Sequence, residues 1–191
     1  KEDYQFRKTV TAWDDSSRSA HWRNRAEGQP FFSVFNFGIT HESQVWAQAD
    51  NPLLVDDNLE VPVPPYLPDS EIGRKDIRRV YSNIVAMDRQ VGEILNQLEE
   101  DGLLDSTIIF WYSDHGGPLP RQKRLLYDSG IHLPLIIRFP DQFKAGEIDD
   151  QLISFVDFKS TILSLAGIEP PSYVDGRAFL GEYANSGNRD Y

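Results

Sequence analysis

The sequence predicts an α/β domain whose mostly parallel sheet is flanked by helices. Two apolar runs, residues 107–112 and 133–139, lack the polar alternation of half-buried strands and are typical of strands covered on both faces. Between residues 77 and 98, apolar side chains recur at steps of three and four, which indicates a long helix. The order strand, long helix, strand, loop, strand, helix is the alternation expected of such a domain.

The first third of the chain contributes one strand and two loops. Residues 1–30 are polar and irregular, and we interpret them as an ordered loop because free linkers seldom carry two tryptophans. The aromatic run Phe31–Phe37 predicts a buried strand that leads to His41. Residues 44–69 contain five prolines and predict a long surface excursion.

The long helix has recognisable end signals. Asp69 or Ser70 can cap its start, and Gly102 can adopt the left-handed conformation that ends a helix. Residues 152–155 predict a further strand, which runs into a short helix over residues 157–165.

The composition is that of a folded domain and argues against two classes of partner. Hydrophobic residues make up 40% and charged residues 26%, and the net charge is −11. An acidic chain repels nucleic acid and anionic lipid, and no apolar run is long enough to span a membrane. The absence of cysteine excludes disulfides, thiolate metal sites and a thiol nucleophile. We expect neither nucleic acid nor a membrane as partner.

Polar side chains follow the predicted strands at the edge where parallel sheets bind ligands. Asp114 and His115 follow the run 107–112, and a carboxylate beside an imidazole suits calcium, manganese or zinc. Gly116 and Gly117 would let the backbone turn sharply, so that both side chains face one cation. The alternative is that Asp114 caps a turn and His115 fills space.

A basic cluster, Arg121, Lys123 and Arg124, stands out on this acidic chain. Beside a metal it would bind an anion such as sulfate or phosphate; the alternative is a solvated loop with salt bridges to residues such as Asp128. His41 could donate a proton to a leaving oxygen, or it could be a surface or packing residue.

The motifs around these residues resemble the sulfatase family of the alkaline-phosphatase-like superfamily. The similar segments are Pro30–Phe32, Thr40–Glu42, Tyr81–Gly92, Tyr112–Gly117, Lys123, Leu126–Gly130, Pro134–Arg138, Ile153–Asp157, Leu165–Ile168 and Gly176–Leu180. Several motifs in the right order are more specific than any one of them. The resemblance implies an alkaline-phosphatase-like fold, incomplete in this chain.

The resemblance also implies roles for individual residues. Asp114 and His115 match the family's metal-binding positions. Lys123 matches the lysine that holds the sulfate group during catalysis, and His41 matches the catalytic histidine near the scissile ester. Arg121 matches no invariant position of the family, and we assign it to substrate binding only because it belongs to the same basic cluster as Lys123. One divalent metal is implied: calcium is the family's usual ion, and His115, where many sulfatases have Asn, leaves manganese and zinc open.

Two parts of the family's pattern are missing from the chain. Neither Cys-x-Pro-x-Arg nor Ser-x-Pro-x-Arg occurs, the motif whose first residue becomes the formylglycine nucleophile. The three Asp-Asp pairs do not follow a buried strand, and we interpret them as solvated. Residues 1–191 are therefore interpreted as the central and C-terminal part of a sulfatase catalytic domain, without its upstream nucleophile region and C-terminal subdomain.

The resemblance implies a sulfuric ester hydrolase that acts on a sulfated small molecule or carbohydrate, with a formylglycine nucleophile outside this chain. The chain alone is expected to be inactive. By family expectation the protein is periplasmic or secreted. Two alternatives stay open: a phosphodiester or phosphonate ester hydrolase of the same superfamily, and a non-catalytic domain that binds a sulfated ligand.

Overall fold

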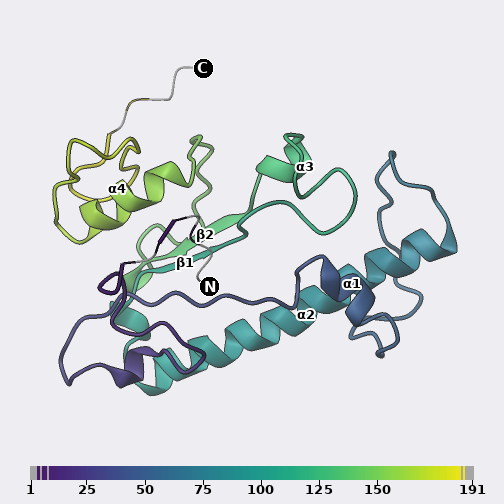
Figure 1. The fold of residues 1–191 in the computed structure, drawn as a ribbon, viewed down its shortest axis with the longest axis horizontal. Coiled ribbons are helices and arrows are strands. Elements are labelled where there is room, and N and C mark those ends of the chain that lie inside the picture. The colour runs from purple at the N-terminus through teal and green to yellow at the C-terminus, as the bar shows by residue number, and fades with distance from the viewer. Residues whose placement is uncertain (1–3, 5, 8, 186, 188–191) are drawn as a thin grey trace. The chain divides into compact units, whose positions relative to one another are not determined.

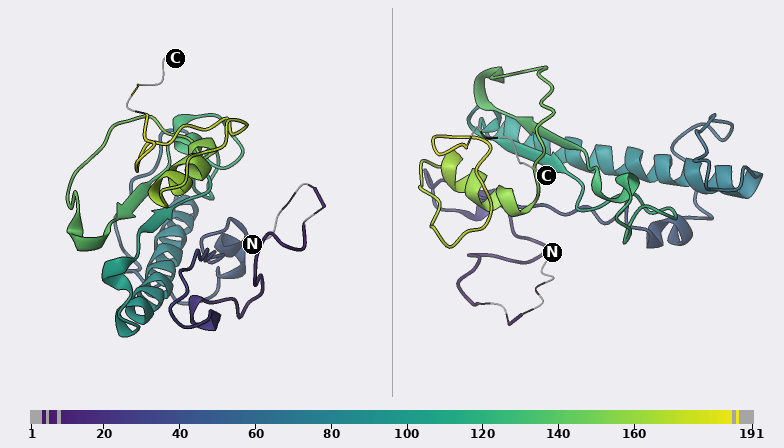
Figure 2. Two further views of the ribbon diagram at one scale, coloured as in Figure 1. Left: turned by 90° about the vertical axis from the view of Figure 1, so that its left-hand side faces the viewer. Right: turned by 90° about the horizontal axis from the view of Figure 1, so that it is seen from above.

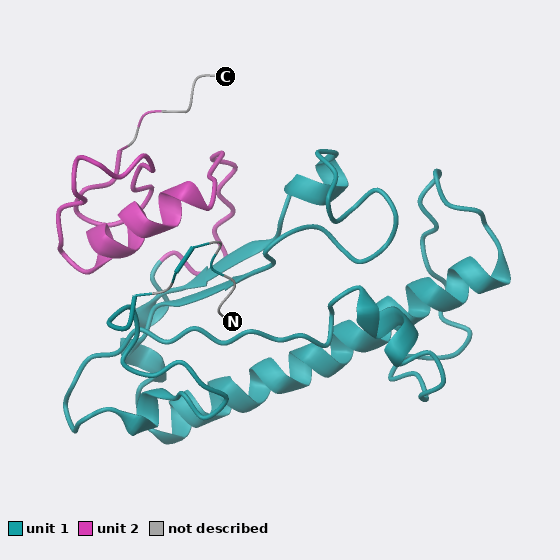
Figure 3. Cartoon of the chain, in the orientation of Figure 1, with its two compact units in different colours: residues 1–143 teal, residues 144–191 magenta. Residues whose placement is uncertain are grey.

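A computed structural model describes residues 4, 6–7, 9–185 and 187, in two compact units of residues 1–143 and 144–191 (Figure 3). The helices and strands of the first unit are the 3-10 helix η1 (Trp22–Asn24), α1 (Ser43–Ala47), α2 (Glu71–Glu100), η2 (Leu104–Ser106), β1 (Ile109–Tyr112), α3 (Asp128–Ile131), β2 (Leu135–Arg138) and η3 (Pro140–Gln142) (Figure 1). The second unit contains α4 (Val156–Leu165).

The long helix α2 confirms the predicted end signals and runs without interruption (Figure 2). The Ser70 side chain caps it by accepting a hydrogen bond of 3.2 Å from the Gly73 N–H. At the other end, Gly102 has the left-handed φ of 65° that terminates a helix. No helix in the described part of the chain combines the length and the apolar character needed to cross a bilayer.

The proline-rich segment is held against α2 by polar contacts. The buried Arg78 donates from Nε to the Leu59 carbonyl at 2.9 Å, and the buried Arg79 donates to the Asn51 carbonyl. Because these carbonyls lie outside helices and strands, the arginines supply donors that secondary structure would otherwise provide. The expected surface excursion is therefore packed on the helix rather than projecting freely.

The two strands pair in antiparallel fashion, with Ile109 opposite Arg138 and Tyr112 opposite Leu135. The mostly parallel sheet predicted from the sequence is not confirmed, because the described residues contain only this two-stranded sheet. The predicted cover on both faces is also wrong, because Tyr112 and Ile136 are exposed. The loop 113–134 is long enough for a crossover, but it contains only a four-residue helix, α3, instead of a crossover helix and returns the chain to the same end of the strand pair.

Two further predicted strands do not form among the described residues. Residues 31–37 are extended without a ladder partner, and residues 152–155 are irregular. Phe32 and Val34 are exposed, so the predicted burial of the first segment is wrong for these residues. The segment nevertheless carries the chain to His41, as expected.

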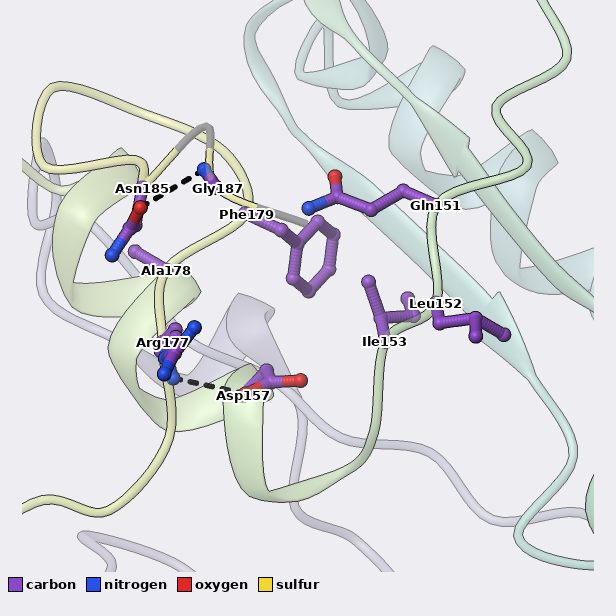
Figure 4. A pocket seen from close by; sticks show the side chains of 9 residues that line it. All are labelled: Gln151, Leu152, Ile153, Asp157, Arg177, Ala178, Phe179, Asn185 and Gly187. Atoms are coloured by element: carbon purple, nitrogen blue, oxygen red, sulfur yellow. Dashed lines mark hydrogen bonds between the residues drawn. The ribbon is translucent and has the colours of Figure 1, made fainter. Parts of the chain in front are cut away.

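In the second unit, hydrogen bonds from α4 hold the loop that follows it. The buried Asp157 accepts a 2.9 Å hydrogen bond from the Arg177 N–H, and Thr161 Oγ1 accepts one of 3.2 Å from the Phe179 N–H. A small pocket lies here, and Figure 4 shows Asp157 directed toward the Arg177 backbone at its wall. The buried polar side chains Asp157 and Thr161 therefore have a structural role, because they hold the following loop on α4.

Candidate active site

The loop between β1 and β2 is closed at its neck by two glycines. The Gly116 N–H donates to the Gly130 carbonyl at 3.0 Å, and a Cβ atom on Gly116 would collide with the Ser129 carbonyl. Neither Gly116 nor Gly117 has a positive φ. The chain does bend at residues 114–116, as predicted, but Gly116 is needed for the close approach of two backbone segments rather than for a left-handed conformation.

Asp114 and His115 lie side by side directly after β1. The Asp114 Oδ1 and His115 Nε2 atoms are 3.6 Å apart, and His115 Nδ1 is 2.8 Å from the Gly116 carbonyl. Because a carbonyl only accepts, Nδ1 carries the proton and Nε2 keeps its lone pair, which is the tautomer of a metal-binding histidine.

These two side chains fit part of a metal site. Ligands at right angles around a cation, each about 2.4 Å from it, are about 3.4 Å apart, which is close to the observed separation. The residues that the structure describes contain no group of three or more His, Cys, Asp or Glu side chains that could hold a metal. Asp114 and His115 would therefore supply two ligands of a larger set.

The structure brings His41 and Lys123 together, although they are 82 positions apart in the sequence. The Lys123 Nζ and His41 Nε2 atoms are 3.1 Å apart. The Lys123 N–H also donates to the Gly117 carbonyl at 3.1 Å, so the main chain at Lys123 lies beside the turn that carries Asp114. Sequence reasoning had assigned these residues to one site only through the family resemblance.

His41 is approached by a hydrogen-bond donor at each ring nitrogen. The Ser43 main-chain N–H donates to His41 Nδ1 at 3.2 Å, and the Ser43 hydroxyl lies 2.9 Å from the same atom. The Lys123 ammonium, which also only donates, lies 3.1 Å from Nε2, so two donors compete for the one lone pair of the neutral ring. An oxyanion placed beside Lys123 and His41 would accept from both and relieve this competition.

Glu42 is a site residue that sequence reasoning missed. Its carboxylate accepts two hydrogen bonds from Arg124, of 2.6 and 2.8 Å, and its Oε1 lies 3.4 Å from Lys123 Nζ. Only 16% of the Glu42 side chain and 18% of the Lys123 side chain are exposed. The hydrogen bonds from Arg124, supported by Lys123, hold the pKa of Glu42 below its usual value, against the opposing effect of partial burial.

The salt bridge considered between Lys123 and Asp128 does not form. Lys123 pairs with Glu42 instead, and the Asp128 carboxylate lies 3.3 Å from Nδ1 of the exposed His132. The solvated-loop alternative is therefore confirmed in part: residues 121 and 124–128 are exposed and the basic cluster forms salt bridges, but the partner is Glu42 and the Lys123 side chain is mostly covered.

Arg121 points elsewhere, between two tyrosines. Its guanidinium lies 5.2 Å from the ring centre of Tyr66 and 5.2 Å from that of Tyr127. The Arg121 carbonyl accepts a 2.6 Å hydrogen bond from the Ser129 hydroxyl, and its φ of 66° lies in the left-handed region. Arg124 shares this unusual conformation with a φ of 72°. Such backbone strain in non-glycine residues is concentrated at functional sites.

Comparison with known proteins identifies relatives of the whole chain. The sulfatase family model matches residues 14–168. The ulvan-active sulfatase of Formosa agariphila is 47% identical over 97% of this chain and 37% of its own length. A solved structure of a protein in complex with its substrate D-glucosamine-2-N,6-O-disulfate matches 62% of this chain and 26% of its own, with a TM-score of 0.54 and 33% identity. The phosphonate monoester hydrolase of Silicibacter pomeroyi matches 80% of this chain and 31% of its own, with a TM-score of 0.53 and 30% identity.

Proposed function

Because this chain belongs to the sulfatase family, we propose that the protein containing it hydrolyses a sulfate ester of a carbohydrate. The observation that carries the proposal is the 3.1 Å contact between Lys123 Nζ and His41 Nε2, two cationic or proton-bearing groups from separate loops. The carbohydrate is supported by the relative named an ulvan-active sulfatase and by the structural neighbour that binds a sulfated glucosamine.

In the proposed reaction a nucleophile attacks sulfur, and the bond from sulfur to the alcohol oxygen breaks. The electron pair of that bond stays on the alcohol oxygen. Lys123 would stabilise the sulfuryl oxygens. His41, as an imidazolium protonated on both nitrogens, would give its Nε2 proton to the departing oxygen and be left as the neutral imidazole.

Asp114 and His115 would hold one divalent metal, calcium by family habit, with manganese or zinc as alternatives. When bound, such an ion supplies positive charge that favours the developing negative charge of the sulfuryl oxygens. The fit of the two side chains supports this assignment: their separation and the tautomer of His115 both suit ligation.

The rest of the catalytic domain is proposed to lie outside these residues. The chain spans 37% of the length of its Formosa relative and contains no cysteine, so a formylglycine nucleophile would come from another part of the protein. Residues 1–191 would then be the central and C-terminal part of the catalytic domain. A periplasmic or secreted location is proposed on family grounds alone.

The structural similarity to a phosphonate monoester hydrolase favours one alternative, hydrolysis of a phosphonate or phosphodiester. The same cationic groups would stabilise a phosphoryl group. The experiment therefore compares the cleavage of sulfate esters with the cleavage of phosphorus esters.

The experiment measures ester cleavage by the full-length protein, with an aryl sulfate, a sulfated oligosaccharide, an aryl phosphodiester and an aryl phosphonate. We expect sulfate release to dominate, and Lys123→Ala to lower kcat/KM for the aryl sulfate by about 10²–10³-fold, as loss of one charge-stabilising donor does. His132→Ala, a change at an exposed histidine, is the matched control. Faster cleavage of the phosphorus esters would favour the alternative, and binding of sulfated sugar without turnover would indicate a non-catalytic domain.

A further inference from the structure

Glu42 occupies the centre of a charged cluster that joins two loops. It directly follows His41 and is the residue before α1, whereas Lys123 and Arg124 lie in the loop between β1 and β2. One carboxylate thus contacts two cations at 2.6–3.4 Å. The two cations differ in exposure, since 68% of the Arg124 side chain is exposed compared with 18% of Lys123.

This unequal exposure separates two roles of the carboxylate. The pair with Arg124 is bidentate and largely solvated, which is a geometry that ties loops together. The contact with Lys123 is longer but mostly covered, where solvent screens charge less. A carboxylate in that position stabilises the ammonium form of Lys123 beside His41 Nε2.

We propose that Glu42 is a positioning residue that keeps Lys123 charged and directed at His41 before substrate binds. This inference rests on the proposed function for its catalytic consequence, although the electrostatic effect can be measured without substrate. Among the described residues, His41 and Glu42 are the titratable groups in contact with the Lys123 ammonium, and Arg124 acts on it through Glu42.

Two substitutions distinguish the effect of the Glu42 charge on Lys123 from the role of Glu42 in joining the two loops. Glu42→Gln removes the negative charge with little change in shape, so the ammonium form of Lys123 should lose stabilisation. Arg124→Gln removes the competing cation but keeps Glu42, so the carboxylate acts on Lys123 alone and the ammonium form should gain stabilisation. If Glu42 only ties the two loops together, both variants should change the labelling of Lys123 in the same direction.

The test measures the pH dependence of acetylation of Lys123 by acetic anhydride in the full-length protein, with the labelled peptide quantified by mass spectrometry. We expect the midpoint to move down by about one pH unit in Glu42→Gln, as loss of a nearby opposite charge does. It should move up, by less, in Arg124→Gln. Glu42→Asp, which keeps the charge, should restore most of the shift. Lys75, exposed on α2, is the internal control and should keep its midpoint throughout.

Equal shifts in both variants, or no shift in Glu42→Gln, would overturn the inference. If Glu42→Gln does not fold, Arg124→Gln still decides, because a downward or absent shift contradicts the proposed competition. In the catalytic arm, the alkaline limb of kcat/KM for the aryl sulfate should follow the labelling midpoint. A wild-type protein that labels as expected but releases no sulfate would refute the proposed function and leave the positioning role supported.

Discussion

At the scale of single residues, the surroundings of Arg121 suggest what its side chain is available to bind. Tyr66 and Tyr127 lie against the guanidinium, which leaves the in-plane N–H edge as the surface for a ligand. Lys123 and Arg124 both pair with Glu42, whereas Arg121 has no carboxylate partner among the described residues. A second anionic group on a carbohydrate substrate suits such an edge.

We expect Arg121→Gln to raise KM for a sulfated oligosaccharide by about tenfold, because a charge-assisted hydrogen bond is worth about 1.5–3 kcal/mol. The KM for a small aryl sulfate should rise less, since it carries no second anion. Steady-state kinetics of both substrates check this, with Arg89→Gln on the exposed surface of α2 as control. Comparing oligosaccharides whose second anion is a carboxylate or a sulfate identifies the group; equal effects on both substrate sizes would contradict the assignment.

At the scale of elements, the C-terminal end of α2 is tied to η1 by one carboxylate. Asp101 accepts hydrogen bonds from Trp22 Nε1 at 2.7 Å and from Arg23 Nε at 2.8 Å. Arg23 also donates at 3.3 Å to the Gln97 carbonyl, which accepts the Asp101 main-chain N–H as well. Arg23 above all, and then Trp22, lower the pKa of Asp101. The buried Trp22 is thereby fixed on the helix end.

Asp101→Asn should lower the melting temperature of the full-length protein by roughly a few degrees at pH 7. Because the pKa of Asp101 is lower in the folded state than in the unfolded state, its contribution is present above pH of about 4 and is lost as the pH falls through the folded pKa. The difference from wild type should therefore shrink in thermal scans below pH of about 4. Glu100→Gln, which removes only an exposed pair with Arg23, should have little effect. A constant difference at all pH values would indicate that the charge is not responsible.

The ends of α2 and the positions of β1 and β2 were predictable at this scale, whereas the direction and the burial of the strands were not. Ser70 and Gly102 act locally, through hydrogen bonding and backbone conformation within one turn, so their residue types are sufficient evidence. The pairing of β1 with β2 depends on where a loop of more than twenty residues brings the chain, which apolar periodicity does not encode. The exposure of Phe32 could not be predicted either, because it depends on which distant segments pack beside residues 31–37.

At the scale of the whole molecule, the candidate site consists of pairs of interacting side chains, and the two members of a pair such as His41 and Lys123 come from separate segments of the chain. His41 and Lys123 could be assigned from the family motifs, because each has a recognisable neighbourhood in sequence. Glu42 and Arg124 could not, because charge complementarity across 82 positions has no local signature. The site of a complete protein would combine these pairs with groups outside the chain.

Metal removal tests that combination in the full-length protein. Chelation should abolish sulfate release, and calcium should restore it if the proposed ion is right. Asp114→Ala should lower the bound metal, whereas His115→Asn, which offers an oxygen ligand, should retain calcium and weaken zinc binding. Elemental analysis and activity after reconstitution check both, with His132→Asn as control. Full activity in protein shown to be free of divalent metal would contradict the assignment.

The hydrogen bond from the Gly116 N–H to the Gly130 carbonyl closes the intervening segment, which carries Arg121 and Lys123, into a loop. This closure lies next to the antiparallel pair of β1 and β2. Insertions or substitutions within the closed loop can change its length or shape without changing the register of the two strands. Changes elsewhere in this loop can thus alter what Arg121 contacts without moving the turn that bears Asp114.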